Sequence, residues 1–211
     1  TLPVLTLRGT SEPLVVRNMV IAGFANGKLM AFDTDTGAVR WEVRVASAKG
    51  HSEIERLVDI DGSLLLIDNI VYAVSYQGAI AAIDIASGRK LWTRDASSYV
   101  GMDSGFGNIY VAGFFDGSNV NFQGVNTSSS ALYSSTSNSE DAFVAKYNTN
   151  GELLWVIHTS CTNDSRALDV RVDASGVYFA GYYDEVGMDF IDVFSATASL
   201  APGFDSEDIF I

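Results

Sequence analysis

The sequence predicts an all-β protein built from repeated strand-and-turn units, and three observations support that prediction. A pattern of apolar strand, turn, glycine and tryptophan occurs three times, at residues 31–41, 82–92 and 144–155. The composition is rich in Gly and aromatic residues and includes only three Pro, which favours strands and turns over helices. The repeats of about 40 to 65 residues are typical of stacked supersecondary units.

Four apolar, aromatic-rich segments bounded by turn residues are predicted to be one inner strand repeated. In each of them small residues alternate with large ones, as crowding near a common axis requires. A strand that packs on both faces can be apolar throughout. The four segments are residues 20–24, 71–76, 109–115 and 177–183.

The strand that follows each inner strand is reached in two ways. In the first half it follows at once, through Asn26-Gly27 and Gln77-Gly78, and Asn-Gly is the preferred two-residue hairpin turn. In the second half it comes after long stretches rich in Ser, Asn and Gly, residues 116–140 and 184–207, which we expect to be surface loops. The following strands are predicted at residues 28–32, 79–83, 141–147 and 208–211.

A further strand in the first three units carries a tryptophan at a fixed distance after a turn glycine. A large side chain there fills the wedge that widens away from the axis, so we expect these tryptophans to pack rather than to hold a cofactor. The unit is therefore a four-stranded antiparallel propeller blade, and the chain is predicted to contain four blades. The residues of this structural blade motif are Gly37, Trp41, Gly88, Trp92, Gly151 and Trp155.

The fourth unit is predicted to lack its outer strand. The alternating segment Thr1–Leu7 could supply that strand, either from the same chain or from a second copy. A bare sheet edge would otherwise invite aggregation.

The charge is negative and uneven. Residues 1–103 hold ten Lys/Arg and twelve Asp/Glu, whereas residues 104–211 hold three and fourteen. Contacts to phosphate need cationic side chains, so we expect no nucleic-acid partner. No apolar run approaches the roughly 20 residues that span a bilayer, so we expect no direct membrane insertion.

Candidate catalytic and metal-binding groups are few. Cys161 is the one cysteine and His51 and His158 are the two histidines, so neither an internal disulfide nor a zinc site of the usual spacing is expected. Residues 59–62 are a fragment of a calcium-loop pattern without its further ligands. No nucleophile-elbow signature is present. We therefore expect no catalytic residues, no metal, no cofactor and no enzyme activity.

Two segments in residues 1–103 resemble the BamB family of outer-membrane β-barrel assembly lipoproteins. They are residues 2–13, with the specific Leu-x-Leu-Arg-Gly segment at residues 5–9, and residues 52–61, with the specific Glu-x-x-Arg-Leu-x-Asp-x-Asp segment at residues 53–61. Residues 71–92 fit as well. The resemblance implies a quinoprotein-like propeller of which residues 1–103 supply two blades and an N-terminal closing strand. It also implies a location at the periplasmic face of the outer membrane, although no signal or lipid anchor is expected in this chain.

The same resemblance implies a partner surface. In the BamB family the two segments dock the periplasmic domains of BamA, and by position the corresponding residues are Leu5, Leu7, Arg8, Asp59 and Asp61. Exposed leucines supply apolar anchors, and arginine makes bidentate polar contacts. The alternative is that the leucines pack a closing strand and the aspartates cap a turn.

Residues 104–211 resemble instead the repeats of bacterial cell-surface propeller proteins, on residues 108–115 and 140–147. The change of pattern and charge near residue 103 suggests a recombined or engineered chain that joins two half-propellers. The predicted function is a non-catalytic scaffold or protein-interaction module. The alternatives are a cell-surface binding repeat that uses the long loops, and a fragment of a quinone-dependent dehydrogenase.

The resemblance also bears on assembly. Blades from an eight-bladed ring splay by a small angle, so four of them form half a ring. Two chains are then predicted to close the ring head to tail as a homodimer. The alternative is a compact four-bladed monomer.

Overall fold

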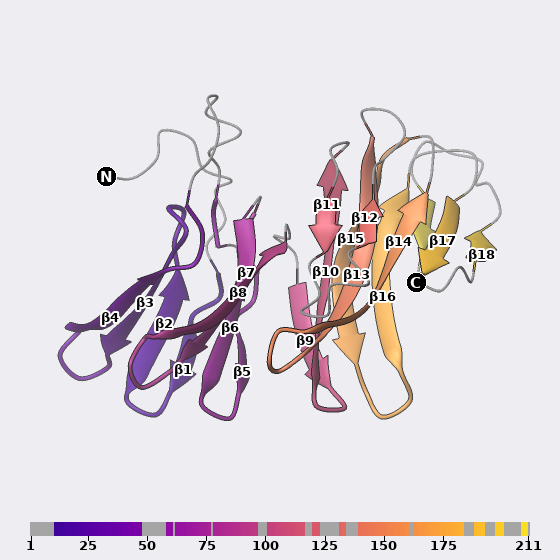
Figure 1. The fold of residues 1–211 in the computed structure, drawn as a ribbon. Coiled ribbons are helices and arrows are strands. Elements are labelled where there is room, and N and C mark those ends of the chain that lie inside the picture. Colours follow the sequence, from indigo (N-terminus) through magenta and orange to yellow (C-terminus); the bar gives the residue numbers. More distant parts are fainter. Residues whose placement is uncertain are drawn as a thin grey trace. The chain divides into compact units, whose positions relative to one another are not determined.

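The computed structural model describes residues 11–47, 58–60, 62–76, 78–96, 101–116, 120–122, 131–133, 139–160, 163–183, 188–192, 197–200 and 208–210. All regular elements in these residues are strands. None of them is a helix long and apolar enough to cross a membrane. The chain divides into two compact units, Thr1–Tyr99 and Val100–Ile211, which are drawn in Figure 1.

The N-terminal unit contains two four-stranded antiparallel sheets, and in both the strands follow chain order. This arrangement confirms the predicted four-stranded antiparallel blade. Blade 1 consists of β1 (Leu14–Val16), β2 (Met19–Gly23), β3 (Lys28–Asp33) and β4 (Val39–Arg44). Blade 2 consists of β5 (Leu65–Ile67), β6 (Ile70–Val74), β7 (Gly78–Asp84) and β8 (Lys90–Ala96).

The described part of the C-terminal unit contains a six-stranded sheet and a three-stranded sheet that resemble these blades in their central strands, and one two-stranded sheet. Blade 3 consists of β9 (Gly101–Gly105), β10 (Asn108–Asp116), β13 (Glu140–Asn148) and β14 (Leu153–Ser160). Blade 4 consists of β15 (Ser165–Val172), β16 (Val177–Tyr183) and β19 (Asp208–Phe210), paired in that order.

The two long stretches of the C-terminal unit contain strands, so the expectation of surface loops is wrong at these places. In the first stretch β11 (Val120–Phe122) pairs with β12 (Ala131–Tyr133). In the second, β17 (Met188–Asp192) pairs with β18 (Thr197–Leu200) and also with the edge of β14. The added hairpin makes blade 3 part of a six-stranded sheet. An edge strand offers unpaired backbone groups to any later strand, and such non-local pairing leaves no local signal in the sequence.

The turn between β2 and β3 also differs from the prediction. Gly23 pairs with Leu29, and the N–H of Phe24 donates to the carbonyl of Lys28 at 2.9 Å. The turn therefore covers residues 25–27 instead of two residues. In this turn Gly27 adopts a positive φ of 71°, so a single left-handed residue suffices, as in three-residue hairpins.

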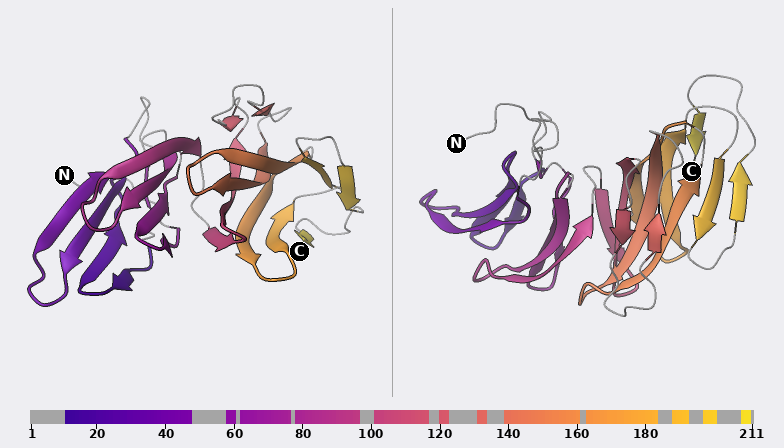
Figure 2. Two further views of the ribbon diagram at one scale, coloured as in Figure 1. Left: turned by 60° about the horizontal axis from the view of Figure 1, so that its bottom comes forward. Right: turned by 45° about the horizontal axis from the view of Figure 1, so that its top comes forward.

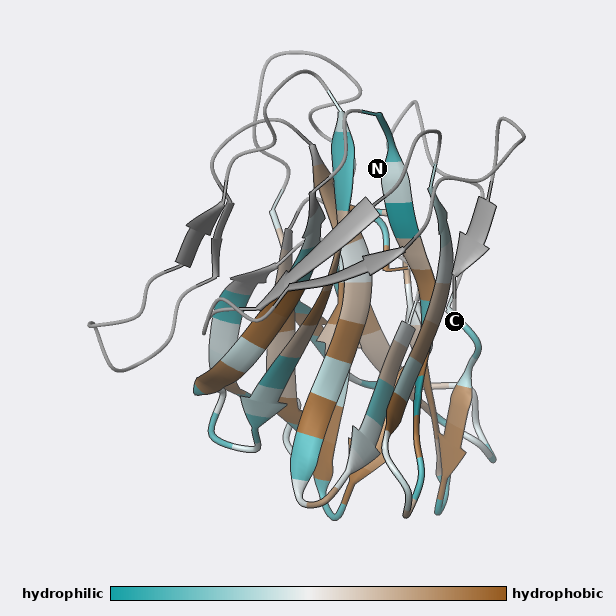
Figure 3. Cartoon of the chain, turned by 90° about the vertical axis from the view of Figure 1, so that its right-hand side faces the viewer, coloured by the Kyte–Doolittle hydropathy of each residue, from teal (hydrophilic) through white to brown (hydrophobic). Residues whose placement is uncertain are grey.

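The core of the N-terminal unit lies between its two sheets, which are seen from two directions in Figure 2. The inner strands β2 and β6 are apolar throughout, as strands that pack on both faces can be. In Figure 3 apolar and polar residues form alternating bands along other strands of the chain. Blade 1 contributes aliphatic side chains and one indole, and blade 2 contributes aliphatic side chains. The most buried members are Ile21, Leu29, Ala31, Trp41, Ile60, Val71, Ala73, Ala81, Ile83 and Ile85.

The C-terminal unit has a core of its own between blades 3 and 4. Tyr110 and Val144 come from blade 3, and Val170 and Tyr183 come from blade 4. Trp155 and Phe179 pack against this cluster from positions that are partly exposed.

Candidate partner-docking site

The residues predicted to dock a partner lie mostly outside the described part of the chain. Leu5, Leu7, Arg8 and Asp61 belong to the residues that the structure does not describe. Asp59 is described, and its side chain is completely buried.

Asp59 lies on a short segment, residues 58–60, that is bonded to both blades of the N-terminal unit. The carbonyl of Asp59 accepts a hydrogen bond from the N–H of Tyr76, next to β6 of blade 2, at 2.9 Å. The N–H of Ile60 donates to the carbonyl of Phe24, next to β2 of blade 1, at 3.4 Å. The segment therefore joins the same ends of the two sheets.

A glycine in blade 1 permits the close approach of this segment. A Cβ atom placed on Gly23 would lie 2.4 Å from Cγ2 of Ile60, a distance that real Cβ contacts do not reach. Any larger residue at position 23 would push residues 58–60 away from the sheet.

Ser11 links the two sequence segments that carry the predicted site. Its N–H donates to the carbonyl of Ile60 at 3.2 Å, and its buried hydroxyl accepts from the N–H of Gly23 at 2.7 Å. Ser11 follows Arg8 by three residues, and Ile60 lies between the two predicted aspartates. The structure thus brings the chain just after the first segment to the second segment. Sequence reasoning did not single out Ser11 or Gly23, although a serine directly after Leu-x-Leu-Arg-Gly-Thr could have drawn attention.

The burial of Asp59 changes the role that its position suggests. A carboxylate is costly to bury unless polar groups surround it, and a fully buried side chain does not reach a partner's surface. The printed bonds that hold residues 58–60 come from the backbone, and the Asp59 side chain lies buried beside them.

One tryptophan of the blade motif packs between two sheets, and the other two pack on tyrosines of their own sheets. Trp41 is 9% exposed, and its Nε1 donates to the carbonyl of Ile85 in blade 2 at 2.9 Å. The ring of Trp92 lies 5.8 Å from that of Tyr72, and the ring of Trp155 lies 5.9 Å from that of Tyr110, between centroids. Tilted ring pairs at such distances contribute packing energy.

The glycines of the motif all lie in turns. Gly37, Gly88 and Gly151 have φ values of 69°, 69° and 76°, in the left-handed region that favours glycine. Each of the first two ends a turn that begins with an aspartate. Hydrogen bonds lower the pKa of both carboxyl groups below the ordinary range, from Arg40 and Thr36 to Asp33 and from Ser87 to Asp84.

Comparison with known proteins identifies the family. The family model described as outer membrane protein assembly factor BamB matches residues 1–118. The chain belongs to this family. It is 59% identical over 112 residues to BamB of Pseudomonas aeruginosa, a match that covers 53% of this chain and 30% of that protein. It is 41% identical over 109 residues to BamB of Alkalilimnicola ehrlichii, which covers 52% and 28%. The matching region thus spans less than a third of these BamB relatives.

Solved structures show the fold. BamB from Moraxella catarrhalis matches with a TM-score of 0.52 and 22% identity, over 94% of this chain and 60% of that chain. The quinohemoprotein alcohol dehydrogenase from Comamonas testosteroni matches with a TM-score of 0.56 and 14% identity, over 93% and 36%. At these identities the likeness concerns the fold alone, and it confirms the predicted β-propeller class.

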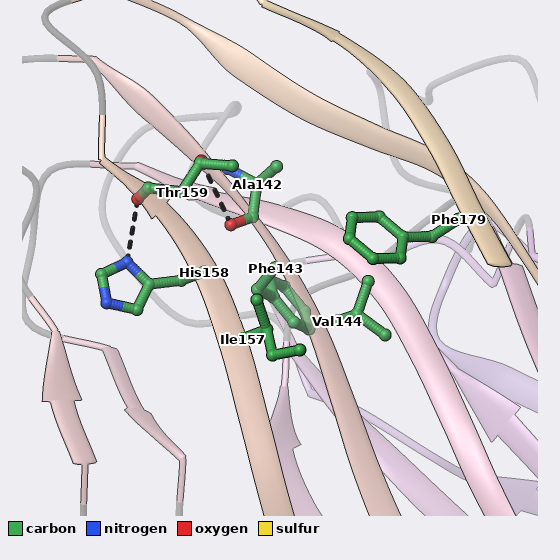
Figure 4. Close-up of a pocket in the computed structure, with 7 residues that line it drawn as sticks. All are labelled: Ala142, Phe143, Val144, Ile157, His158, Thr159 and Phe179. Carbon is green, nitrogen blue, oxygen red and sulfur yellow. Dashed lines mark hydrogen bonds between the residues drawn. The ribbon is translucent and has the colours of Figure 1, made fainter. Parts of the chain in front are cut away.

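A depression in the C-terminal unit is lined by Phe143, Val144, Ile157, His158 and Phe179, with Ala142 and Thr159 beside them (Figure 4). Its volume is about 140 Å³, part of which is open solvent. The Nδ1 atom of His158 lies 2.8 Å from the carbonyl oxygen of Thr159, and burial lowers the pKa of His158. In the described part of the chain no three His, Cys, Asp or Glu side chains gather as metal ligands would.

Proposed function

We propose that this chain is a non-catalytic propeller scaffold in outer-membrane protein assembly, acting at the periplasmic face of the outer membrane. The observation that supports this role is the 59% identity over 112 residues to a protein named outer membrane protein assembly factor BamB. The match covers only 30% of that relative. The role, the location and the partner are therefore proposed for this chain.

The proposed partner is the set of periplasmic domains of BamA. Leu5, Leu7, Arg8 and Asp61 are the proposed contacts: two apolar anchors, one bidentate donor and one carboxylate. Asp59 is proposed as a positioning residue, because its side chain is buried. The hydrogen bonds of Ser11 to Ile60 and Gly23 support the proposal, since they hold the ends of both sequence segments together.

Calorimetric titration of the full chain with purified BamA periplasmic domains tests this function. We expect saturable binding. Arg8→Ala and Leu7→Ala should each weaken it by about tenfold or more, as truncation of central anchors does. Arg89→Ala and Leu91→Ala are matched controls, because both side chains are exposed in the same unit and lie outside the proposed contacts. No measurable binding of the unaltered chain, or equal loss in the controls, would sink the proposal.

The proposal extends to the origin of the second half. The BamB family match ends at residue 118, and the acidic excess begins after residue 103. These boundaries support a junction between two propeller families. Amplification and sequencing of genomic DNA across codons 95–125 would test it, and one uninterrupted natural gene would exclude an engineered junction.

A further inference from the structure

Ser11 is buried, although the two residues directly after it are exposed. It is 2% exposed, whereas Glu12 and Pro13 lie at the surface. A buried hydroxyl is costly unless it takes part in a hydrogen bond. The hydroxyl of Ser11 accepts one from the N–H of Gly23, the last residue of β2, at 2.7 Å. The side chain of Ser11 is therefore tied to blade 1.

The backbone of Ser11 is tied to a different part of the chain. Its N–H donates to the carbonyl of Ile60 at 3.2 Å. Ile60 is completely buried and belongs to the core between blades 1 and 2. Ser11 thus connects β2, through its hydroxyl, with residues 58–60, through its N–H.

Two glycines near this connection leave room for residues 58–60. A Cβ atom placed on Gly27 would lie 3.2 Å from Cγ2 of Val58, and one placed on Gly23 would lie 2.4 Å from Cγ2 of Ile60. Val58 and Ile60 are both buried. Their side chains therefore rest on two positions at which the chain has no side chain of its own.

The bonds of Ser11 lie between the two groups of proposed partner contacts. Arg8 precedes Ser11 by three residues, and Asp61 directly follows Ile60. A partner that binds both segments benefits when they are held in place beforehand, because binding then costs less ordering of the chain. The N–H of Ser11 on the carbonyl of Ile60 is a direct link between the two segments.

We propose that Ser11 is a positioning residue for partner docking. Its buried hydroxyl, held by the N–H of Gly23, fixes the segment that carries Arg8 relative to the segment that carries Asp61. The inference rests on the proposed docking function and adds to it a side chain that is too buried to touch the partner.

A positioning role has a kinetic signature that differs from that of a contact. If only a fraction of the molecules holds the two segments in the binding-competent arrangement, the apparent affinity falls in proportion to that fraction. Truncation of a contact acts mainly on the dissociation rate. Ser11→Ala should therefore lower the association rate constant about fivefold and change the dissociation rate constant by about twofold or less. Arg8→Ala should mainly raise the dissociation rate constant.

Surface plasmon resonance with the full chain immobilised and purified BamA periplasmic domains in solution measures both rate constants. Gly23→Ala is a second variant. It keeps the hydroxyl of Ser11 but displaces Ile60, so it should give the same signature. Ser165→Ala is the matched control, because it also removes a buried hydroxyl that accepts a backbone N–H, but in the C-terminal unit. It should leave both rate constants unchanged.

Amide hydrogen exchange tests the same role without the partner. The N–H of Tyr76 donates to the carbonyl of Asp59, so its exchange reports whether residues 58–60 are held. In Ser11→Ala this amide should exchange about tenfold faster, as expected when a supporting buried hydrogen bond is lost and the segment opens more often. In Ser165→Ala its exchange should not change.

The outcomes separate the inference from the docking function. If the unaltered chain binds and Ser11→Ala binds with the same rate constants, the inference is wrong while the docking function stands. A rise confined to the dissociation rate constant would make Ser11 a contact and would also overturn it. Unchanged exchange of Tyr76 in both Ser11→Ala and Gly23→Ala would overturn it whether or not the partner binds. If the unaltered chain does not bind, the docking function is wrong, and the role of Ser11 in docking is wrong with it.

Discussion

The two units stack their sheets in different chemical ways. In the N-terminal unit the contact is aliphatic, and one indole, that of Trp41, locks it through a single hydrogen bond. In the C-terminal unit polar side chains of one sheet accept hydrogen bonds from backbone N–H groups of the other. Asp103 accepts from Val172 at 2.7 Å, and Ser165 accepts from Ala142 at 3.0 Å. The comparison teaches that one blade geometry can be held by an aromatic wedge or by directional polar bonds.

The polar contact of the C-terminal unit is a connected network. The hydroxyls of Thr159 and Ser165 lie 2.6 Å apart, and both accept from the N–H of Ala142. Nearby, the guanidinium of Arg166 lies 4.6 Å from the ring centroid of Phe114 and pairs with Glu140. Buried networks of this kind are stable only while every member keeps a hydrogen-bond partner. Removal of a single hydroxyl group should therefore lower the stability of this interface.

The largest expected effect is the removal of the aromatic wedge. Trp41→Ala should lower the free energy of unfolding by about 3–5 kcal/mol, because a buried aromatic side chain is lost and a cavity remains. Trp155→Ala is the matched variant in the other unit. It should cost less, since Trp155 is only partly buried. Urea unfolding followed by far-ultraviolet circular dichroism measures both, and equal losses would contradict the contrast between the units.

The next effect concerns the two equivalent turns. A left-handed residue other than glycine costs about 1–2 kcal/mol, and this cost applies to both Gly37→Ala and Gly88→Ala. At Gly88 the new methyl group also meets Trp41 at 2.7 Å, which should add about 1–3 kcal/mol of overpacking. The urea concentrations at the unfolding midpoints of the two variants measure the difference in their stability. If they coincide, Trp41 does not rest on the glycine.

A smaller loss is expected in the polar interface. Ser165→Ala removes one acceptor of the Ala142 N–H and should cost about 1–3 kcal/mol, the usual price of a disturbed buried hydrogen bond. Ser175→Ala is the control, because Ser175 bonds Asp173 in an exposed turn, and it should change stability by about 0.5 kcal/mol or less. If Ser175→Ala lowered the free energy of unfolding as much as Ser165→Ala does, the loss could not be attributed to the buried network.

The smallest effect is a dependence on pH in the C-terminal unit. Burial lowers the pKa of His158 below its ordinary value of 6.5, so the unfolded chain binds the proton more readily than the folded one. Well above pH 6.5 the histidine is neutral in both states and does not affect the free energy of unfolding. As the pH falls from 6.5 through the folded pKa, protonation of the unfolded chain lowers that free energy. Thermal melting between pH 7.5 and 5 should show a decline that His158→Gln reduces. An unchanged slope in that variant would assign the decline to other groups.

Local patterns made most of the fold predictable. The inner strands, the strands after them and the glycine–tryptophan motif depend on alternation and turn residues within a few positions, and the structure has strands at all of these places. What the sequence did not reveal were the non-local relations. The pairing of β17 with β14 joins residues about 30 positions apart, and the link between Ser11 and Ile60 closes a longer loop.

The candidate site divides in the same way. The residues of the candidate site could be predicted from the resemblance of two sequence segments. Their exposure to solvent could not be predicted, because it depends on which other parts of the chain pack on each residue. Asp59 illustrates this: its sequence context suggests an exposed acidic contact, whereas the segment that carries it is bonded to both sheets and its side chain is buried.

The sequence by itself determined the repeated unit, the all-β class and the position of each turn glycine, because strand alternation and left-handed turns are properties of neighbouring residues. Only the tertiary structure decided which copy of a unit is covered. The turns at residues 33–37 and 84–88 share the hydrogen bond from the glycine N–H to the aspartate carbonyl and the same glycine φ of 69°. Gly88 is nevertheless buried beneath an indole, whereas Gly37 is exposed. Whether a turn is buried depends on which sheet stacks against it, so two turns with the same local backbone can differ in exposure.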